Sequence, residues 1–264
     1  MNDKIINAWN TWSNDWYQKY RTEVVINQIV ENPSSAFPEE VFKIIIRYFV
    51  DLKNKKVLVP SSGDNHAVYA FCLMGAHVTS CDISEMQIVN SKRISDKYGW
   101  DITYICDDTM GLSKVKSNEY DLVYTSNGVH VWIDNLDSMY ENIKRTLKPS
   151  GISIMYDIHP YLRPFGINRS KTLEITKRYD EIGPFGEIPT YKWRMQDLIN
   201  AIVKSGMHIK EIEEFSTQDP TFWIDEEEEN IEDFNEDELK ELLDWKMNPK
   251  AALPQWIIIV SSCS

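Results

Sequence analysis

The chain has 264 residues, of which 42% are hydrophobic, and this size allows one substantial core with an appended cap. Its net charge of −13 and pI of about 4.9 argue against a nucleic-acid partner, because phosphate backbones are bound by clustered Lys and Arg. No membrane-length apolar run, signal-peptide pattern or Cys/His ligand spacing is present, so we expect a cytoplasmic protein with reduced thiols, no membrane contact and no metal.

The first 52 residues are predicted to form a helical cap. Residues 3–30 are interpreted as a helix because four aromatic side chains recur on one face: Trp9, Trp12, Trp16 and Tyr20. Such a stripe is typical of core packing. It also suits a lid over a bound cation, because aromatic faces attract cations and a lid excludes water. Pro38 is then expected to open a second helix that continues through Asp51.

Strands and helices alternate from residue 53 to residue 158. The predicted strands are 57–60, 78–81, 102–106, 120–124 and 152–156. The predicted helices between them are 65–74, 84–98 and 135–147, and 148–151 is expected to be a turn. This alternation predicts an α/β fold with a Rossmann-like, doubly wound and mostly parallel sheet that is covered on both faces.

The regular pattern weakens after Asp157. We expect a helix over 170–180, an extended piece at 187–189, a helix over 194–205 and strands at 209–215 and 252–262. The two last strands predict one antiparallel, edge-type strand near the C-terminus. Between them lies an acidic insertion, 217–245, whose run at 225–241 is interpreted as a solvated face. We expect a single domain, 1–264, with a cap (1–52), a cofactor-binding core (53–158) and acceptor-side elements (159–264).

The turn after the first strand is the most informative local feature. Gly63 allows a tight turn, and Asp82 stands at the end of the next strand, 19 residues later. This is the arrangement of a βαβ unit in which an acid accepts hydrogen bonds from a ribose. A dinucleotide site needs more glycines, but the flanking positions are Ser61 and His66. Asp64, as a helix N-cap or a cofactor contact, would repel a pyrophosphate, which disfavours NAD, FAD and ATP.

Five segments in order resemble the class I S-adenosylmethionine-dependent methyltransferases. They are VLVPSSGD (57–64), VTSCDIS (78–84), ITYICDD (102–108), YDLVY (120–124) and LKPSG (147–151). The resemblance spans roughly residues 55–158 and implies a seven-stranded sheet with one antiparallel strand. The sequence departs from the family where an acid is common, at Val59, and where glycines are common, at Ser61 and Asn65.

The resemblance also implies a set of cofactor contacts. Ser61 and Gly63 would form the turn that faces S-adenosylmethionine, Asp82 would hold the ribose and Ile83 would pack on adenine. Asp107 or Asp108 would receive the adenine amino group. Ser126 or Asn127 would lie beside the methionine moiety.

On the acceptor side, His130 is the first candidate for a catalytic base, because it closely follows the fourth strand and imidazole titrates near neutral pH. Residues of the aromatic-rich segments are candidates for the acceptor pocket: Trp12, Trp16, Trp132, His159, Tyr161, Tyr191 and Trp193. The sequence thus predicts methyl transfer to a small-molecule acceptor, with S-adenosylhomocysteine as product. The alternative is a non-catalytic ligand- or protein-binding module on the same fold, and a nicotinamide oxidoreductase ranks last.

Overall fold

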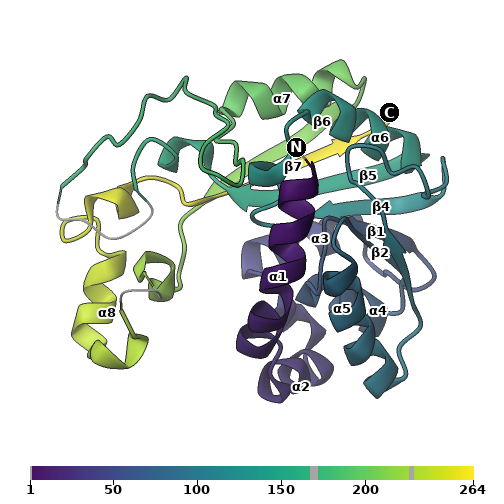
Figure 1. Ribbon diagram of the computed structural model, residues 1–264, viewed down its shortest axis with the longest axis horizontal. Coiled ribbons are helices and arrows are strands. Elements are labelled where there is room, and N and C mark those ends of the chain that lie inside the picture. Colours follow the sequence, from purple (N-terminus) through teal and green to yellow (C-terminus); the bar gives the residue numbers. More distant parts are fainter. Residues whose placement is uncertain (1, 167–171, 226–228) are drawn as a thin grey trace.

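The computed structural model describes residues 2–166, 172–225 and 229–264 (Figure 1). Its centre is a seven-stranded sheet with the order β3-β2-β1-β4-β5-β7-β6. The strands are β1 (Lys56–Pro60), β2 (His77–Asp82), β3 (Ile102–Cys106), β4 (Tyr120–Thr125), β5 (Leu147–Ile158), β6 (His208–Phe215) and β7 (Trp256–Ser262). β1 to β5 pair in parallel, and β7 is antiparallel to both β5 and β6. The predicted α/β class is confirmed, and β6 forms the edge outside the antiparallel strand.

Helices cover both faces of this sheet (Figure 1). They are α1 (Asn2–Tyr20), α2 (Glu23–Glu31), α3 (Glu39–Tyr48), α4 (His66–Leu73), α5 (Glu85–Tyr98), α6 (Leu136–Thr146), α7 (Met195–Lys204) and α8 (Glu236–Leu243). Within β1, Val57 and Val59 join the core with α2 to α5, while Leu58 joins the core with α6 and α7. Alternate side chains of the strand are thus buried on opposite faces, which explains its continuous apolar sequence.

Helix boundaries follow local capping chemistry. The helix expected over 3–30 is two helices, because the chain breaks at Arg21 and Thr22 caps α2. Asn65, and not Asp64, caps α4 by accepting a hydrogen bond from the Ala67 amide at 2.8 Å. The cap predicted at Ser84 is present, since its hydroxyl accepts from the Gln87 amide at 3.2 Å.

The prediction fails most clearly between β5 and α7. Residues 170 and 171 of the expected helix lie outside the described residues, and 172–180 contains no helix. Leu173 and Ile175 are exposed, so a helix there would have no apolar face to bury. The piece 187–189, expected to be extended, is a turn that joins the paired residues Phe185 and Thr190. The expected turn at 148–151 belongs to β5, where the pairing with β4 shifts register.

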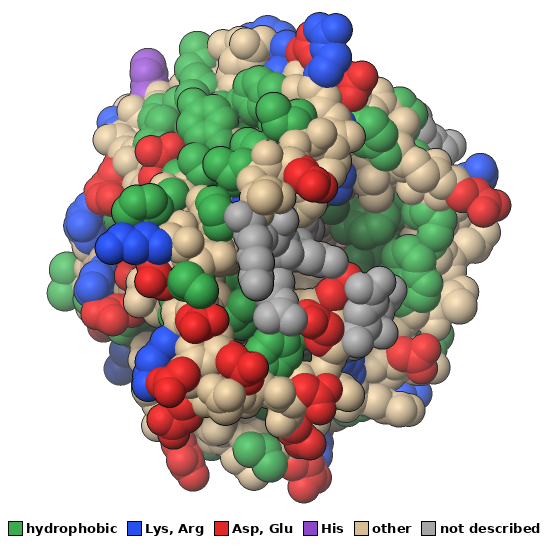
Figure 2. Space-filling model, turned by 90° about the vertical axis from the view of Figure 1, so that its left-hand side faces the viewer, with side chains coloured by type: hydrophobic (Ala, Val, Ile, Leu, Met, Phe, Trp, Pro, Cys, Tyr) green, Lys and Arg blue, Asp and Glu red, His purple; other side chains and the backbone are tan. Residues whose placement is uncertain are grey.

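A small lobe, the α8 lobe (residues 220–225 and 229–252), stands beside the sheet (Figure 1). Trp223, Ile224 and Leu242 form its own apolar cluster with Leu162. Figure 2 shows Asp and Glu side chains gathered on the lower part of this face of the molecule, in agreement with the three acids in the first turn of α8. No helix among the described residues is long and apolar enough to cross a membrane.

Candidate functional site

The carboxyl ends of β1, β2 and β4 meet where the strand order reverses. β1 lies between β2 and β4, so the connections after these strands leave the sheet in opposite directions. Ligands of open α/β sheets bind in the crevice at this topological switch point. The loops that follow the three strands therefore define the candidate site.

The β1–α4 loop contains two residues in the left-handed backbone region, and one of them is glycine. Gly63 has φ +51°, in the left-handed region, and Ser61 before it has φ +47°. A Cβ atom on Gly63 would lie 2.7 Å from Oε1 of Gln87, on α5. That oxygen also accepts a hydrogen bond from the Asp64 amide at 3.2 Å. The torsion angle therefore favours glycine at position 63, and a larger residue would also displace the flexible Gln87 side chain from its hydrogen bond with the Asp64 amide.

Asp82 connects this loop to the end of β2. Its Oδ2 accepts a hydrogen bond from the Gly63 amide at 2.8 Å, and its Oδ1 accepts one from the Ser84 amide at 2.8 Å. The side chain is buried, and burial raises its pKa to about 6 although both amide hydrogen bonds favour the carboxylate. The two residues that were predicted to face one ligand, Gly63 and Asp82, are thus in direct contact.

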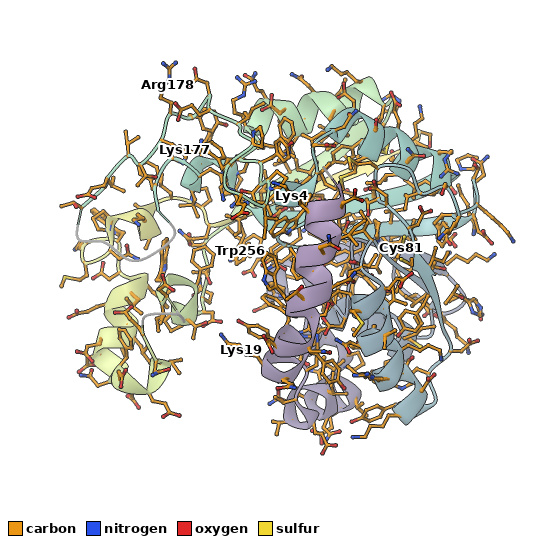
Figure 3. All side chains as sticks on the ribbon, in the orientation of Figure 1. Lys4, Lys19, Cys81, Lys177, Arg178 and Trp256 are labelled. Carbon is orange, nitrogen blue, oxygen red and sulfur yellow. The ribbon has the colours of Figure 1, made fainter. Side chains whose placement is uncertain are left out.

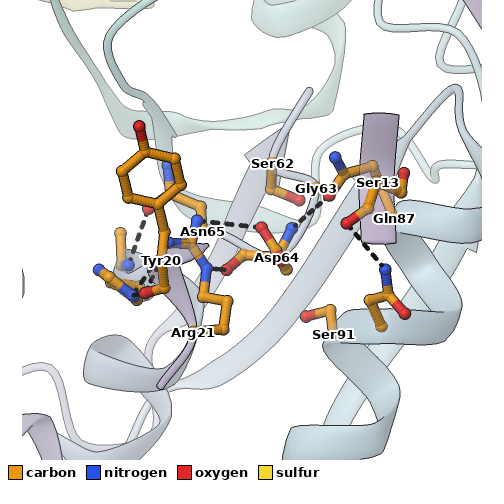
Figure 4. A network of polar contacts seen from close by, with 12 residues as sticks. Ser13, Tyr20, Arg21, Ser62, Gly63, Asp64, Asn65, Gln87 and Ser91 are labelled. Carbon is orange, nitrogen blue, oxygen red and sulfur yellow. Dashed lines mark hydrogen bonds and ion pairs between the residues drawn. The ribbon is translucent and has the colours of Figure 1, made fainter. Parts of the chain in front are cut away.

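Arg21, at the end of α1, holds the same loop from the other side (Figure 4). Its guanidinium forms an ion pair with Asp64 at 2.9 Å and donates to the Asp64 carbonyl at 2.6 Å. Burial raises the pKa of Asp64, and the Arg21 charge opposes that rise. Burial, followed by the charge of Arg21, lowers the pKa of His66 to about 3, which keeps this ring neutral. The Asp64 charge is thus paired, and its repulsion of a pyrophosphate is weaker than the sequence suggested.

Two buried oxygens of the crevice have no hydrogen-bond partner among the described residues. They are Oδ2 of Asp64 and the hydroxyl oxygen of Thr125, which is the last residue of β4. Buried polar atoms of folded proteins are nearly always paired. An unpaired acceptor at the head of the β1–α4 loop is therefore suited to a ligand that brings a donor or a positive charge.

The two acids after β3 build their own loop. The Asp107 carboxylate accepts hydrogen bonds from the amides of Asp108 and Lys114 and from the Ser113 hydroxyl. The Asp108 carboxylate accepts one from the Met110 amide at 2.9 Å. The Asp107 carboxylate is thus occupied by main-chain and side-chain donors of its loop.

The other cofactor candidates lie on the loops of β1, β2 and β4. The Ser61 hydroxyl is 2.6 Å from that of Thr109, next to the β3 loop acids. The Ser126 hydroxyl is bonded to the Asn65 side chain, which connects the loops after β4 and β1. Ile83 is half-buried, and Asn127 is exposed.

Helix α1 lies across all three loops. Its Trp9 and Trp12 contact Trp132, which follows β4, with ring centroids 5.5 and 6.1 Å apart. Its Asn10 side chain accepts a hydrogen bond from the hydroxyl of Ser84, after β2, at 2.7 Å. With the Arg21 contacts to the β1 loop, α1 is fastened over the carboxyl ends of three strands. Trp16 belongs to the same cluster through Trp9.

His130 is buried in a hydrogen-bonded triad. Its Nδ1 is 2.7 Å from Oδ2 of Asp157, and its Nε2 is 2.9 Å from the Tyr140 hydroxyl. Asp157 also accepts a hydrogen bond from the Gly128 amide at 2.9 Å. Burial by itself raises the pKa of Asp157, but the hydrogen bond and charge of His130 bring it below its usual value. Both ring nitrogens are engaged, which argues against His130 as the base and favours a role in positioning the loop after β4.

The remaining acceptor-side candidates separate in space. His159 is fully buried, bonded to Glu214 at 2.6 Å and to the Tyr161 amide at 3.1 Å, so it serves packing and not a pocket. Tyr161 is exposed. Tyr191 and Trp193 stack on each other with centroids 5.5 Å apart.

The stacked pair is attached to the loop after β4. The Tyr191 amide donates to the Val131 carbonyl, and the Trp193 indole donates to the Ile133 carbonyl. This attachment brings residues 191–193 to the same end of the sheet as Trp132.

Sequence reasoning missed several residues that organise the site. Asn10 and Gln87 lie on helices and Arg21 directly follows α1, and no local pattern connects these residues with the loops that they contact. Asp157 carried a usable signal, because it directly follows the fifth strand as Asp82 follows the second. An acid at a strand's carboxyl end is a candidate for this edge of the sheet.

Comparisons with known proteins agree with this geometry. Residues 59–155 match the model of a family described as a methyltransferase domain. No curated protein sequence matches the chain. A similar solved structure is an S-adenosylmethionine-dependent methyltransferase from Mesorhizobium loti, with 15% identity, a TM-score of 0.60, and coverage of 83% of this chain and 96% of that one.

Two further structures show the same likeness. A candidate S-adenosylmethionine-dependent methyltransferase from Listeria monocytogenes has 19% identity and a TM-score of 0.57, covering 84% of this chain and 96% of that one. A geranyl diphosphate C-methyltransferase from Streptomyces coelicolor, solved with Mg²⁺, geranyl diphosphate and S-adenosyl-L-homocysteine, has 10% identity and a TM-score of 0.60. The alignment covers 84% of this chain and 79% of that one. At these identities the likeness establishes a shared fold.

Proposed function

We propose that this chain, whose residues 59–155 match a methyltransferase domain, is a class I S-adenosylmethionine-dependent methyltransferase that transfers the methyl group to a small-molecule acceptor. The observation that carries the proposal is the position of α1, which is fastened across the loops after β1, β2 and β4. A helix in that position covers the crevice and restricts access to it, which favours a small molecule over a polymer. The neighbour from Streptomyces coelicolor acts on geranyl diphosphate, which is also a small molecule.

The residues of the crevice fit S-adenosylmethionine. In our proposal Asp82 accepts the ribose hydroxyls, Ile83 packs on adenine, and the loop after β3, with Asp107 and Asp108, borders the adenine amino group. The unpaired Oδ2 of Asp64 is an acceptor for the cationic amino group of the methionine moiety. Ser61, Gly63, Ser126 and Asn127 belong to the loops that would surround that moiety.

The bound cofactor supplies an electrophilic methyl group on a sulfonium. The chain's own task is alignment and exclusion of water, and alignment alone is worth about 7–11 kcal/mol of barrier. Trp9, Trp12 and Trp132 form an aromatic cover that serves this purpose. His130, held between Asp157 and Tyr140, keeps the loop after β4 in place. The division into cap (1–52), core (53–158) and acceptor side (159–264) is part of the same proposal.

Calorimetry and a labelled methyl donor test the proposal. We expect the protein to bind S-adenosylmethionine and S-adenosylhomocysteine but not NAD, and to label at least one acceptor in a panel of small metabolites. Asp82→Asn should weaken S-adenosylhomocysteine binding at least tenfold. The matched control is Asp137→Asn, which changes an exposed acid paired with Lys204 and should bind normally. Cofactor binding without any labelled product would favour the non-catalytic alternative, and labelling of nucleic acid only would refute the acceptor class.

A further inference from the structure

A cavity lies beyond the carboxyl end of β5. It has a volume of about 440 Å³, within the range of small-molecule pockets. Its wall begins with Ile158, the last residue of β5, and continues through Arg163 to Lys177 and Lys192. Figure 3 shows Lys177 on the segment that runs between the sheet and the α8 lobe. Phe165 and Phe185 supply apolar surface.

Three cations share this one cavity in a chain of net charge −13. Burial lowers the pKa of Arg163, Lys177 and Lys192, and the charge of Arg163 lowers the pKa of both lysines further. Such mutual repulsion costs stability in the empty pocket. Two carboxylates offset part of it: Asp157 interacts with Arg163, and Glu181 lines the cavity and interacts with Lys177.

The donors of two of these cations are not used by the rest of the protein. Neither the Arg163 guanidinium nor the Lys192 ammonium forms a hydrogen bond or a close ion pair with any part of the chain that the structure describes. Lys177 differs, because its ammonium donates to the carbonyls of Arg178 and Glu181 at 2.7 and 2.8 Å. A half-buried guanidinium that forms no hydrogen bond is unusual, since buried charges are normally hydrogen-bonded as well as paired.

Two short chains of contacts connect the cavity with the loop after β4. Asp157, which interacts with Arg163, is bonded to His130 on the loop after β4. Lys192 lies between Tyr191 and Trp193, and both of these are hydrogen-bonded to the same loop. An acceptor in the cavity would therefore lie at the carboxyl-terminal edge of the sheet, beside the loop after β4.

We propose that Arg163 and Lys192 bind an anionic group, a carboxylate or a phosphate, of the methyl acceptor. This inference rests on the proposed function and deepens it by naming the acceptor class. The planar fork of Arg163 can bind an oxyanion through two hydrogen bonds, and Lys192 adds a point charge. Phe165 and Phe185 provide the apolar surface for the carbon skeleton of the same molecule.

Inorganic phosphate is the probe for a phosphate group on the acceptor, and acetate is the probe for a carboxylate. Each is titrated into the S-adenosylhomocysteine complex by calorimetry and thermal melting, with ionic strength held constant by sodium chloride. We expect one or both to bind with a millimolar Kd and to raise the Tm. The anion that binds more tightly identifies the group as phosphate or carboxylate.

Variants locate the binding. Arg163→Gln and, separately, Lys192→Gln should each weaken anion binding at least tenfold. Arg163→Lys should bind the anion more tightly than Arg163→Gln but less tightly than the wild type. Lys204→Gln is the control, because it removes an exposed lysine on α7 and should change nothing. In chloride alone Arg163→Gln should melt no lower than the wild type, because it removes the repulsion of Arg163 by two lysines, which offsets the lost attraction to Asp157. The variant should also lose the anion-induced rise in Tm.

Two results would overturn the inference. One is that neither anion binds to the complex, and the other is that both glutamine variants bind as tightly as the wild type, which places the anion elsewhere. S-adenosylhomocysteine binding is measured in the same variants and should stay normal. If the wild type does not bind S-adenosylhomocysteine, the proposed function is refuted instead. Failure of the anion site and failure of the proposed function therefore give different results.

Discussion

The ion pair between Arg21 and Asp64 gives the sharpest test of how α1 is fastened to the crevice. We expect Arg21→Met to lower the free energy of unfolding by about 3–5 kcal/mol, because it leaves a buried carboxylate without its partner. The side chain of Asp64 is only 2% exposed, and that of Arg21 is 10% exposed. Arg21 also donates to the Asp64 carbonyl, so the variant removes a main-chain contact as well.

The loss should depend on pH in a defined direction. Burial raises the folded-state pKa of Asp64, and Arg21 opposes this rise. A raised carboxyl pKa contributes stability that is present at low pH and disappears as the pH rises through the folded-state value. Without Arg21 the pKa rises further, so Arg21→Met should be most damaging at high pH. The damage should shrink as acid protonates Asp64.

Urea unfolding followed by tryptophan fluorescence measures this effect. A double-mutant cycle with Asp64→Asn and Arg21→Met isolates the pair, and we expect a coupling energy of about 1–3 kcal/mol, in the range of directly contacting residues. Lys204→Met is the control, because its pair with Asp137 is exposed and should contribute about 0–1 kcal/mol. Additive effects in the cycle, or a loss below about 1 kcal/mol for Arg21→Met, would refute the reasoning.

Three further outcomes follow from the same site. S-adenosylhomocysteine binding should weaken about tenfold per pH unit below pH 6, because the pKa of Asp82 is raised to about 6 and acid protonates its carboxylate. Calorimetry of Asp82→Asn should show an affinity that does not change with pH in this range. Gly63→Ala should lower the unfolding free energy by about 1–3 kcal/mol, because alanine is strained at a φ of +51°. When Gln87→Ala is added to Gly63→Ala, thermal melts should show recovery only of the loss caused by contact between the new methyl group and Gln87. Trp132→Leu should lose about 1–3 kcal/mol from two ring contacts, and stopped-flow release of S-adenosylhomocysteine should be faster.

The sheet and the position of the crevice could be predicted because their signals are local. Each strand of the core is a short apolar run bounded by polar turns, and caps such as Ser84 lie at helix starts. Asp82 was found by its distance along the chain from Gly63. Such features depend on residues within about one βαβ unit, where the geometry between strand, turn and helix is nearly fixed.

The contacts that close the site could not be predicted in the same way. Arg21 and Asp64 lie 43 residues apart, and 27 residues separate His130 from Asp157. No periodicity connects such pairs, because only the folded topology brings them together. The prediction for residues 172–190 was wrong for another reason. The turn there is defined by glycines and prolines that fit several loop geometries, and Gly183 and Gly186 have positive φ.

The distribution of charge constrains how the proposed reaction can proceed. Asp64 and Asp82 lie at the proposed cofactor end of the crevice, while Arg163 and Lys192 lie at the proposed acceptor end. Negative charge on an attacking atom decreases as it bonds to the methyl carbon, so a cation paired with that atom would stabilise the ground state more than the transition state. Catalysis requires the opposite preference. Arg163 and Lys192 should therefore hold an anionic group that does not react, leaving the attacking atom free of cations on the side that faces Trp132.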